Sequence, residues 1–490
     1  MPRRILIGLA ACLLLSVVPS NAQICPLGGT SSSKLVCVIP QTFGAFGLGS
    51  GPGAPLNFNQ HQGHFESDFL SSFEPINEAV GIQVSQLPIA SPSSGITFTY
   101  DPTLKTFAPS SEHTLGPILG ERANTIGRHK LYIAFSFQYF NFSSIDGKDL
   151  GNLPAVFQHQ PVQLGGFNQP CLNQSGMTGQ FAGQPCFVRD YIQTLNNVDL
   201  NVHQYTIYAT YGLTSHLDFS VAIPILDVYI KNTSRATIVP NSVAPSSPAF
   251  PGGVFHQFNG TIVPSCGSAV PCLNATFSSS GSAAGIGDVT LRGKYELYHG
   301  ERVGFAAGVD VRLPSGDESN FLGSGATGVK PFGVLSYNAR VSPHAVIGYE
   351  WNGKSILAGS FVATPTTKGS LPNRFIYTVG ADVSFTKRLT GAFDLYGQRL
   401  FSVPQLFSNP YTDLGKCADQ ACSQATFTAG TTHPDLAVHP GVDYNIISAA
   451  FGLKYRLVKN LVISGNVLVK LNDSGLRSKA IPLVGASYNF

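Results

Sequence analysis

Charged side chains recur at every second residue in several stretches of this chain. In the stretch 287–298, Asp288, Arg292, Lys294 and Glu296 fall on one parity, and mostly apolar residues occupy the other. Because a β-strand places alternate residues on opposite faces, acids and bases gather on one side. There they can brace one another as ion pairs or contact a passing solute, and the sequence leaves both roles open. The charged-face residues are Asp288, Arg292, Lys294, Glu296, Asp310, Arg312, Glu350, Asp382, Asp394, Lys454, Arg456 and Lys470.

Cysteines form a second set with chemistry of its own. Of the nine, Cys12 lies in an apolar N-terminal run, and the other eight fall as near neighbours in Gly-, Pro- and Ser-rich stretches. Eight cysteines allow roughly a hundred connectivities, so sequence alone does not fix the pairing. In an oxidising compartment, local disulfides are the natural expectation. The expected pairs are Cys25–Cys37, Cys171–Cys186, Cys266–Cys272 and Cys417–Cys422.

The sequence gives weaker support for a metal or cofactor site. His61, His64 and Glu66 have ligand types at a workable spacing. However, they lie in a loop-rich leader, and coordination needs a fixed geometry, so we expect no metal. The glycine-rich stretch 47–53 lacks the Lys-Ser/Thr pair of a phosphate-binding loop. We therefore expect no cofactor.

Composition indicates the environment in which these groups work. Charged residues make up 12% of the 490 residues, about half the share of a soluble protein, while Gly numbers 52 and Phe 33. Residues 1–22 combine a basic start, an apolar run and a small-residue cleavage site, as in a secretory signal peptide. With 30 basic and 27 acidic residues, the chain has no electrostatic footprint for nucleic acid.

Period-2 alternation predicts long antiparallel strands from residue 129 onward. Connections between them alternate between short turns and long loops, as in bacterial outer-membrane barrels with periplasmic turns and extracellular loops. The expected fold is therefore an all-β transmembrane antiparallel barrel of twelve strands, with fourteen as the alternative. The predicted strands are 129–142, 198–213, 217–231, 286–299, 302–314, 326–337, 343–352, 373–386, 389–402, 442–457, 461–472 and 478–490.

The faces of these strands predict which side meets lipid. A charged residue on the lipid face costs about 2–4 kcal/mol near the bilayer midplane, so the charged faces should line the lumen. In the last strand, Tyr488 and Phe490 share the apolar face and would reach the periplasmic aromatic girdle. Gly485, Tyr488 and Phe490 resemble the C-terminal signal that outer-membrane barrels present to their assembly machinery.

Three segments carry a family resemblance: YGLTSHLDFSVAIPIL (211–226), GIGDVTLRGKYELY (285–298) and VDVRLPSGD (309–317). They resemble outer-membrane transporters grouped with the meta pathway of phenol degradation. The resemblance covers roughly 198–490 and extends distantly to the long-chain fatty-acid and aromatic-hydrocarbon channels, which have fourteen strands and an N-terminal hatch. It implies passage of small, poorly water-soluble compounds across the outer membrane.

The segment 23–128 differs from the barrel region 129–490. Phe69 to Val80 show helical spacing around Pro75, and residues 87–101 suggest a short hairpin. A lumen-filling or periplasmic plug is the favoured interpretation. Two further barrel strands, or a disordered leader, are the alternatives.

The functional expectation is a passive channel, with a small apolar solute, membrane lipids, lipopolysaccharide and the assembly machinery as partners. The alternatives are a structural or adhesive barrel whose long loops bind partners, and an outer-membrane lipid hydrolase. The hydrolase pattern is incomplete, because His299-Gly300 is followed by Glu301-Arg302, so we expect no enzyme. Pro224 cannot donate a ladder hydrogen bond and therefore suggests a bulge or a lateral opening.

Overall fold

The structure is a computed structural model of the whole chain. It describes residues 24–25, 32–43, 65–66, 73–84, 87–88, 98–101, 106–109, 114–159, 189–243, 251–254, 256–258, 271–359, 366–418, 428–458 and 460–490. The predicted signal peptide, the glycine-rich stretch 47–53 and the His61/His64 pair lie outside the described residues.

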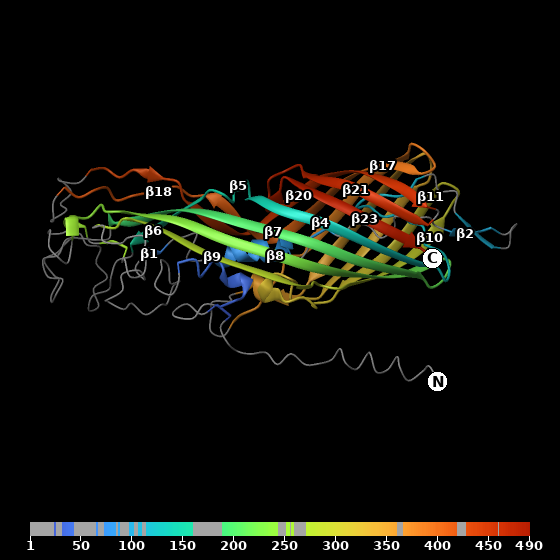
Figure 1. Ribbon diagram of the computed structural model, residues 1–490, viewed down its shortest axis with the longest axis horizontal. Helices are drawn as coiled ribbons and strands as arrows, with labels where there is room; N and C mark the ends of the chain where they lie inside the picture. Colours follow the sequence, from blue (N-terminus) through green and yellow to red (C-terminus); the bar gives the residue numbers. More distant parts are fainter. Residues whose placement is uncertain are drawn as a thin grey trace, which may run out of the picture.

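Twelve antiparallel strands close into one barrel (Figure 1). Each pairs with the next barrel strand along the chain, and β23 pairs with β4 to complete the ring. The all-β fold and the count of twelve rather than fourteen are thus confirmed. The barrel strands are β4 (Leu131–Ile145), β7 (Tyr191–Gly212), β8 (Leu217–Val239), β10 (Thr290–His299), β11 (Val303–Arg312), β12 (Gly328–Tyr337), β13 (Val341–Asn352), β16 (Arg374–Ser384), β17 (Leu389–Ser408), β20 (Leu436–Val458), β21 (Leu461–Lys470) and β23 (Ala480–Asn489).

The two ends of the barrel differ. At one end, hereafter the short-turn end, strands are joined by the turns 213–216, 300–302, 338–340 and 385–388, and β21 starts only three positions after the last residue of β20. The connections at the other end, the long-loop end, are mostly much longer. The C-terminus lies at the short-turn end (Figure 1), where the Phe490 backbone N–H donates to the Leu131 carbonyl oxygen at 2.9 Å.

The barrel wall separates apolar from charged side chains. Phe135, Ile207, Ile347 and Phe451 on the outward parity are each more than two-fifths exposed. Most charged residues on the inward parity, such as Asp310 in β11, are buried. An apolar exterior around a charged interior is the arrangement of an outer-membrane barrel.

Five barrel strands, β4, β7, β8, β17 and β20, run beyond their predicted limits at the long-loop end. The prediction also missed strands inside two long loops. β9 (Asn274–Ile286) pairs with the part of β8 towards the long-loop end, and β6 (Leu153–His159) pairs with β7. β9 reads NATFSSSGSAAGI and has no apolar alternation, so its pairing comes from tertiary context. Smaller pieces are β1 (Phe65–Glu66), β5 (Lys148–Asp149), β14 (Lys354–Ser355), β15 (Gly369–Ser370), β18 (Tyr411–Thr412), β19 (Thr432–His433), β22 (Leu476–Ser478), η2 (Leu35–Cys37), η7 (Pro251–Gly253), η9 (Glu318–Asn320) and η10 (Ile356–Ala358).

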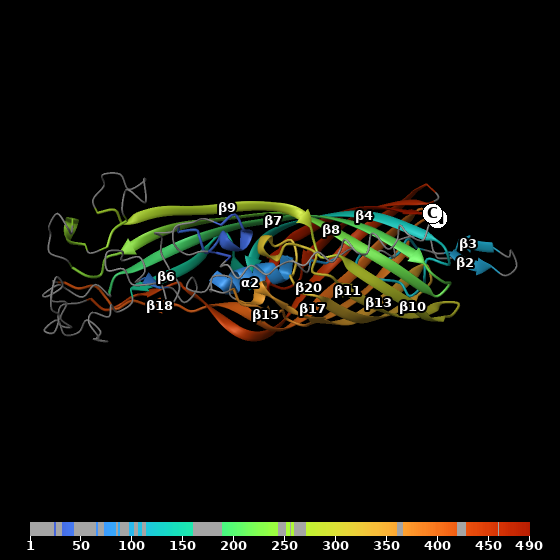
Figure 2. The same cartoon turned by 90° about the horizontal axis from the view of Figure 1, so that it is seen from below.

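The N-terminal part contributes a helix and a hairpin. Helix α2 (Phe73–Val84) has Pro75 in its first turn, where a missing backbone N–H costs nothing, so the helix is not split there. The predicted hairpin at 87–101 is wrong in position, because the hairpin is β2 (Phe98–Asp101) with β3 (Thr106–Pro109). Figure 2 shows this hairpin beyond the end that holds the C-terminus, whereas α2 lies alongside the barrel strands. No described helix is long and apolar enough to span a membrane.

Candidate functional site

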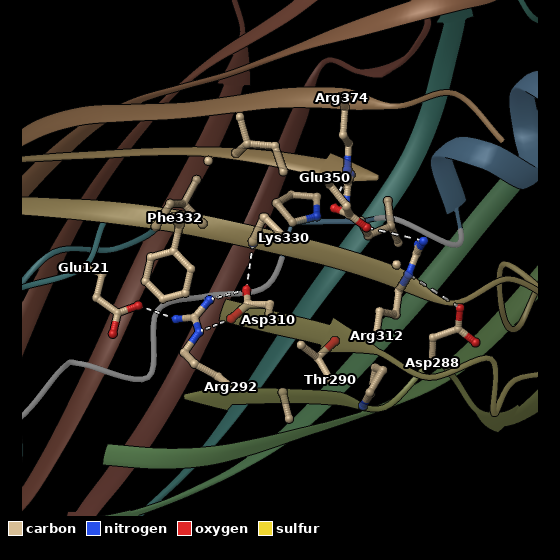
Figure 3. A pocket seen from close by; sticks show the side chains of 18 of the residues that line it. Glu121, Asp288, Thr290, Arg292, Asp310, Arg312, Lys330, Phe332, Glu350 and Arg374 are labelled. Atoms are coloured by element: carbon tan, nitrogen blue, oxygen red, sulfur yellow. Dashed lines mark hydrogen bonds and ion pairs between the residues drawn. The ribbon is translucent and has the colours of Figure 1, made fainter. Parts of the chain in front are cut away.

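A cavity of about 170 Å³ is lined by inward-facing residues of the barrel strands, and Figure 3 shows some of these side chains. Val84, Leu87 and Pro88 border it from the N-terminal part, and Leu119 and Glu121 border it from the segment that precedes β4. One part of its wall is apolar and the other carries charges. The apolar lining includes Ala222, Pro224, Leu226, Leu322, Phe332, Val346 and Ile376. The charged lining is Glu121, Asp288, Arg292, Asp310, Arg312, Lys330, Glu350 and Arg374.

The first charged group centres on Asp310. Its carboxylate accepts two hydrogen bonds from Arg292, at 2.7 and 2.8 Å, and lies 2.8 Å from Lys330 Nζ. Arg292 also donates to Glu121 and places its guanidinium 4.8 Å from the centre of the Phe332 ring. Three neighbouring strands, β10, β11 and β12, thus present alternating charges that satisfy one another, which is how buried charges are tolerated.

The second charged group centres on Glu350. Its carboxylate lies 2.7 Å from Arg374 Nη2 and 3.3 Å from Arg312 Nη2. Asp288 lies on the far side of Arg312, with 4.0 Å between Asp288 Oδ2 and Arg312 Nε (Figure 3). Asp288 also accepts from the backbone N–H groups of Gly316 and Ser324, so it holds the loop that follows β11.

Residues 114–126, hereafter the stopper, are bound by inward-facing side chains of the barrel on the short-turn side of the cavity. Asp394 Oδ2 accepts three consecutive backbone N–H groups from it: Ile118 at 2.9 Å, Leu119 at 2.6 Å and Gly120 at 3.1 Å. The other oxygen, Oδ1, lies 2.6 Å from His344 Nε2. Asp394 is completely buried, so these contacts replace its lost hydration.

Other lumen-facing side chains hold the rest of the stopper. Asp382 lies 2.5 Å from Arg122 Nη2 and accepts from Thr114. Asp218 accepts from the Ile126 backbone N–H at 3.0 Å. Lys454 donates to the Pro117 carbonyl oxygen. The stopper is therefore attached to several strands around the barrel.

On the opposite side, α2 borders the cavity with its last residue, Val84. Ala79, Val80, Ile82 and Val84 are buried. Gln83 Oε1 accepts from the Leu476 backbone N–H at 2.8 Å. The described parts of 23–128 thus contribute to both boundaries of the cavity.

The twelve predicted lumen residues occupy three kinds of position. Five line the cavity: Asp288, Arg292, Asp310, Arg312 and Glu350. Four hold the stopper: Lys294, which lies 3.1 Å from Glu121 Oε1, with Asp382, Asp394 and Lys454. The remaining three lie elsewhere. Glu296 contacts His216 and His299 near the short-turn end, Lys470 contacts Ser144 and Asp473 towards the long-loop end, and Arg456 lies beside a short turn.

Sequence reasoning missed several partners of these residues. Lys330, Phe332, His344 and Arg374 share the inward parity of their strands, so extending the alternation from Glu350 to His344, or from Asp382 to Arg374, would have found them. Glu121 and Arg122 had no such signal, because they precede the first strand and take part only through tertiary contact.

Four described cysteines, which belong to three of the predicted pairs, are disulfide-bonded. Cys25 and Cys37 are bonded, with 2.02 Å between the sulfur atoms. Cys272 and Cys417 are also disulfide-bonded. Their predicted partners, Cys266 and Cys422, and the whole Cys171–Cys186 pair lie outside the described residues.

Pro224 stands where β8 changes partner. Towards the short-turn end β8 pairs with β10 as far as Ala222, and pairing with β9 begins at Ile225. Two β8 residues there oppose the three residues 287–289, which is a β-bulge. The Pro224 carbonyl oxygen accepts from the Gly287 N–H at 2.8 Å, and the ring lines the cavity. A lateral opening at this point stays a prediction.

A polar cluster at the long-loop end lies outside the membrane-spanning part. His433 Nε2 is 2.8 Å from both Asp413 Oδ2 and the Tyr191 hydroxyl. Burial works to raise the pKa of the Asp413 carboxyl, but the hydrogen bonds from His433, Gly415 and Thr431 prevail and lower it. This cluster fastens β18 and β19 to the start of β7.

Comparison with known proteins gives a family match over part of this chain. Residues 192–402 match the family model described as "Putative MetA-pathway of phenol degradation". No curated protein sequence matches. Among solved structures, the COG4313 outer membrane channel from Pseudomonas putida F1 is 10% identical, with a TM-score of 0.36, and the match covers 75% of this chain and 98% of that one.

The Pseudomonas putida toluene transporter TodX is 12% identical, with a TM-score of 0.29, and the match covers 74% of this chain and 89% of that one. The strand pairing, rather than these distant likenesses, establishes the barrel. The resemblance found in the sequence is confirmed over residues 192–402, because this segment of the barrel matches the model of the family with the description "Putative MetA-pathway of phenol degradation".

Proposed function

We propose that the protein is an outer-membrane channel that passes small, poorly water-soluble compounds, including aromatic ones, passively through its lumen. The observation that carries the proposal is the cavity, which lies inside a barrel with an apolar exterior and combines apolar and charged walls. An apolar cavity of about 150 Å³ is large enough for benzene. The cavity of about 170 Å³ therefore suits one small ring.

The proposal includes an orientation. The long loops face the outside, where lipopolysaccharide contacts them, and both termini face the periplasm, because outer-membrane barrels place their short turns there. Residues 23–128 act as a lumen plug, supported by the stopper contacts to Asp218, Asp382 and Asp394. The C-terminal residues Gly485, Tyr488 and Phe490 address the assembly machinery.

We propose no catalytic role. In the hydrolase-like start His299-Gly300, His299 Nδ1 lies 2.8 Å from Glu296 Oε1 at the short-turn end, and no hydrogen bond from this histidine to a serine hydroxyl is found among the described residues. A serine nucleophile needs such a histidine as its own base. The adhesive alternative predicts no solute flux and is separated from the channel by experiment.

The test is flux into liposomes that contain the purified protein. A small apolar aromatic compound and a polar compound of similar size are compared with protein-free liposomes and with liposomes that contain heat-unfolded protein. The channel predicts faster entry of the aromatic solute only with folded protein. Equal entry in all three preparations would overturn it and favour the adhesive barrel. Fractionation adds a check, since recovery as a soluble periplasmic monomer would overturn the membrane location.

A further inference from the structure

Arg312 stands out among the cavity residues because its guanidinium is only partly used. Its Nη2 atom is 2.5 Å from Asn352 Oδ1 and 3.3 Å from a carboxylate oxygen of Glu350. Neither Nε nor Nη1 has a hydrogen-bond partner among the residues that the structure describes. Arg312 is 7% exposed, so these two donors are also removed from bulk water. A buried donor that forms no hydrogen bond destabilises the protein by about 1–3 kcal/mol, and by more if the donor is charged.

The surroundings of Arg312 show what could satisfy these donors. The side chain lines the cavity between Glu350 and Asp288 (Figure 3). Leu226, Leu322 and Phe332 line the same cavity and offer a surface for a ring. A ligand that fits needs an apolar body of small size and at least one oxygen that accepts hydrogen bonds.

The charge balance of the cavity narrows the ligand further. The lining carries four basic residues, Arg292, Arg312, Lys330 and Arg374, and four acidic ones, Glu121, Asp288, Asp310 and Glu350. A carboxylate ligand would add an unbalanced negative charge to a buried site, which is costly. A phenolic hydroxyl stays neutral, since such groups ionise near pH 10. It can accept from Arg312 and donate to a neighbouring carboxylate.

We propose that the cavity is a binding site for a small, neutral, hydroxyl-bearing aromatic compound, and that Arg312 recognises its oxygen. This inference deepens the proposed channel function by naming the class of solute. The inference also predicts selectivity. A hydrocarbon ring forms no hydrogen bond with Nε and Nη1 of Arg312, and a site whose buried polar groups stay unsatisfied discriminates against such a ligand.

The test is a ¹⁹F NMR titration of the purified, folded protein in detergent micelles, with empty micelles subtracted. The probes are 4-fluorophenol, 4-fluorotoluene and 4-fluorobenzoate at neutral pH. We expect saturable binding of 4-fluorophenol and at least tenfold weaker binding of the other two. Equal or tighter binding of the toluene would overturn the role of the oxygen, and tightest binding of the benzoate would overturn the choice of a neutral ligand.

Two variants test Arg312 itself. Arg312→Lys keeps the charge but loses the planar fork of donors, so 4-fluorophenol should bind about tenfold more weakly. Gly328→Ala keeps Arg312 but places a methyl group 2.6 Å from Glu350 Oε1 and 2.8 Å from Arg312 Nη2, so the Glu350–Arg312 pair must shift and binding should weaken likewise. The matched control is Arg399→Lys, on the outside of β17, where Arg399 pairs with Asp443.

The outcomes separate this inference from the channel function. Unchanged 4-fluorophenol binding in folded Arg312→Lys would mean that water alone serves these donors, and the inference would fail even if liposome flux persists. Conversely, loss of binding in Arg312→Lys with no flux in any preparation would support the binding site and overturn the channel. A gel shift on heating confirms that each variant is folded.

Discussion

Asp394→Asn should release the stopper without unfolding the barrel. Asp394 Oδ2 accepts three stopper N–H groups, and Oδ1 contacts His344. Hydrogen bonds to a charged acceptor contribute about 1.5–3 kcal/mol each, against about 0.5–1.5 kcal/mol for neutral pairs. Replacing the carboxylate by an amide therefore loses about 1 kcal/mol for each of the three bonds. The sum, about 3 kcal/mol, should favour local opening of residues 114–126 by roughly a hundredfold.

The assay is hydrogen exchange followed by mass spectrometry on peptides that cover the stopper. We expect exchange at 118–120 to accelerate by about two orders of magnitude, while peptides from β13 and β17 stay protected. Ion conductance in planar bilayers should rise in parallel. Asp227→Asn, at an exposed position on β8, is the control. Unchanged protection at 118–120 in the folded Asp394→Asn protein would refute the reasoning that this carboxylate holds the stopper.

Three further predictions concern the wall and the loops. Pro224→Ala restores a ladder donor at the β8 bulge, so it should slow entry of an apolar aromatic solute at matched folded protein; equal entry would leave Pro224 as only a bend. Reduction should loosen the loops that contain Cys272 and Cys417 but keep the barrel folded, because the hydrogen bonds between its strands hold it. Peptide mapping without reductant should show the bridges Cys266–Cys272, Cys417–Cys422 and Cys171–Cys186, and free thiols at these positions would contradict the pairing. Because the pKa of Asp413 is lowered, its ionised form stabilises the β18–β19 pair above the ordinary value of 3.8, and this contribution is lost as the pH falls through the lower, folded value. Exchange in β18 and β19 should therefore accelerate only in strong acid, and acceleration between pH 5 and 7 would contradict this prediction.

The sequence by itself determined the barrel. Strand alternation has a period of two and depends only on which face meets lipid, so the inward parity of Asp310, Glu350 and Asp394 could be read directly. The alternation of short turns and long loops then indicated how many strands there are and in which order they follow one another. Local rules were sufficient here because each strand pairs with a sequence neighbour in the barrel, and only β23 with β4 closes over a long distance.

Tertiary structure alone decided what fills the lumen. Residues 114–126 have no periodic pattern, and Glu121 and Arg122 reach Lys294 and Asp382 only because the chain folds back into the barrel. β9 likewise forms from a serine- and glycine-rich segment because the long β8 offers it an edge. The cavity and the unsatisfied hydrogen-bond donors of Arg312 arise from these long-range contacts. Alternation predicts which way a side chain points, whereas its partner depends on segments far away in the sequence.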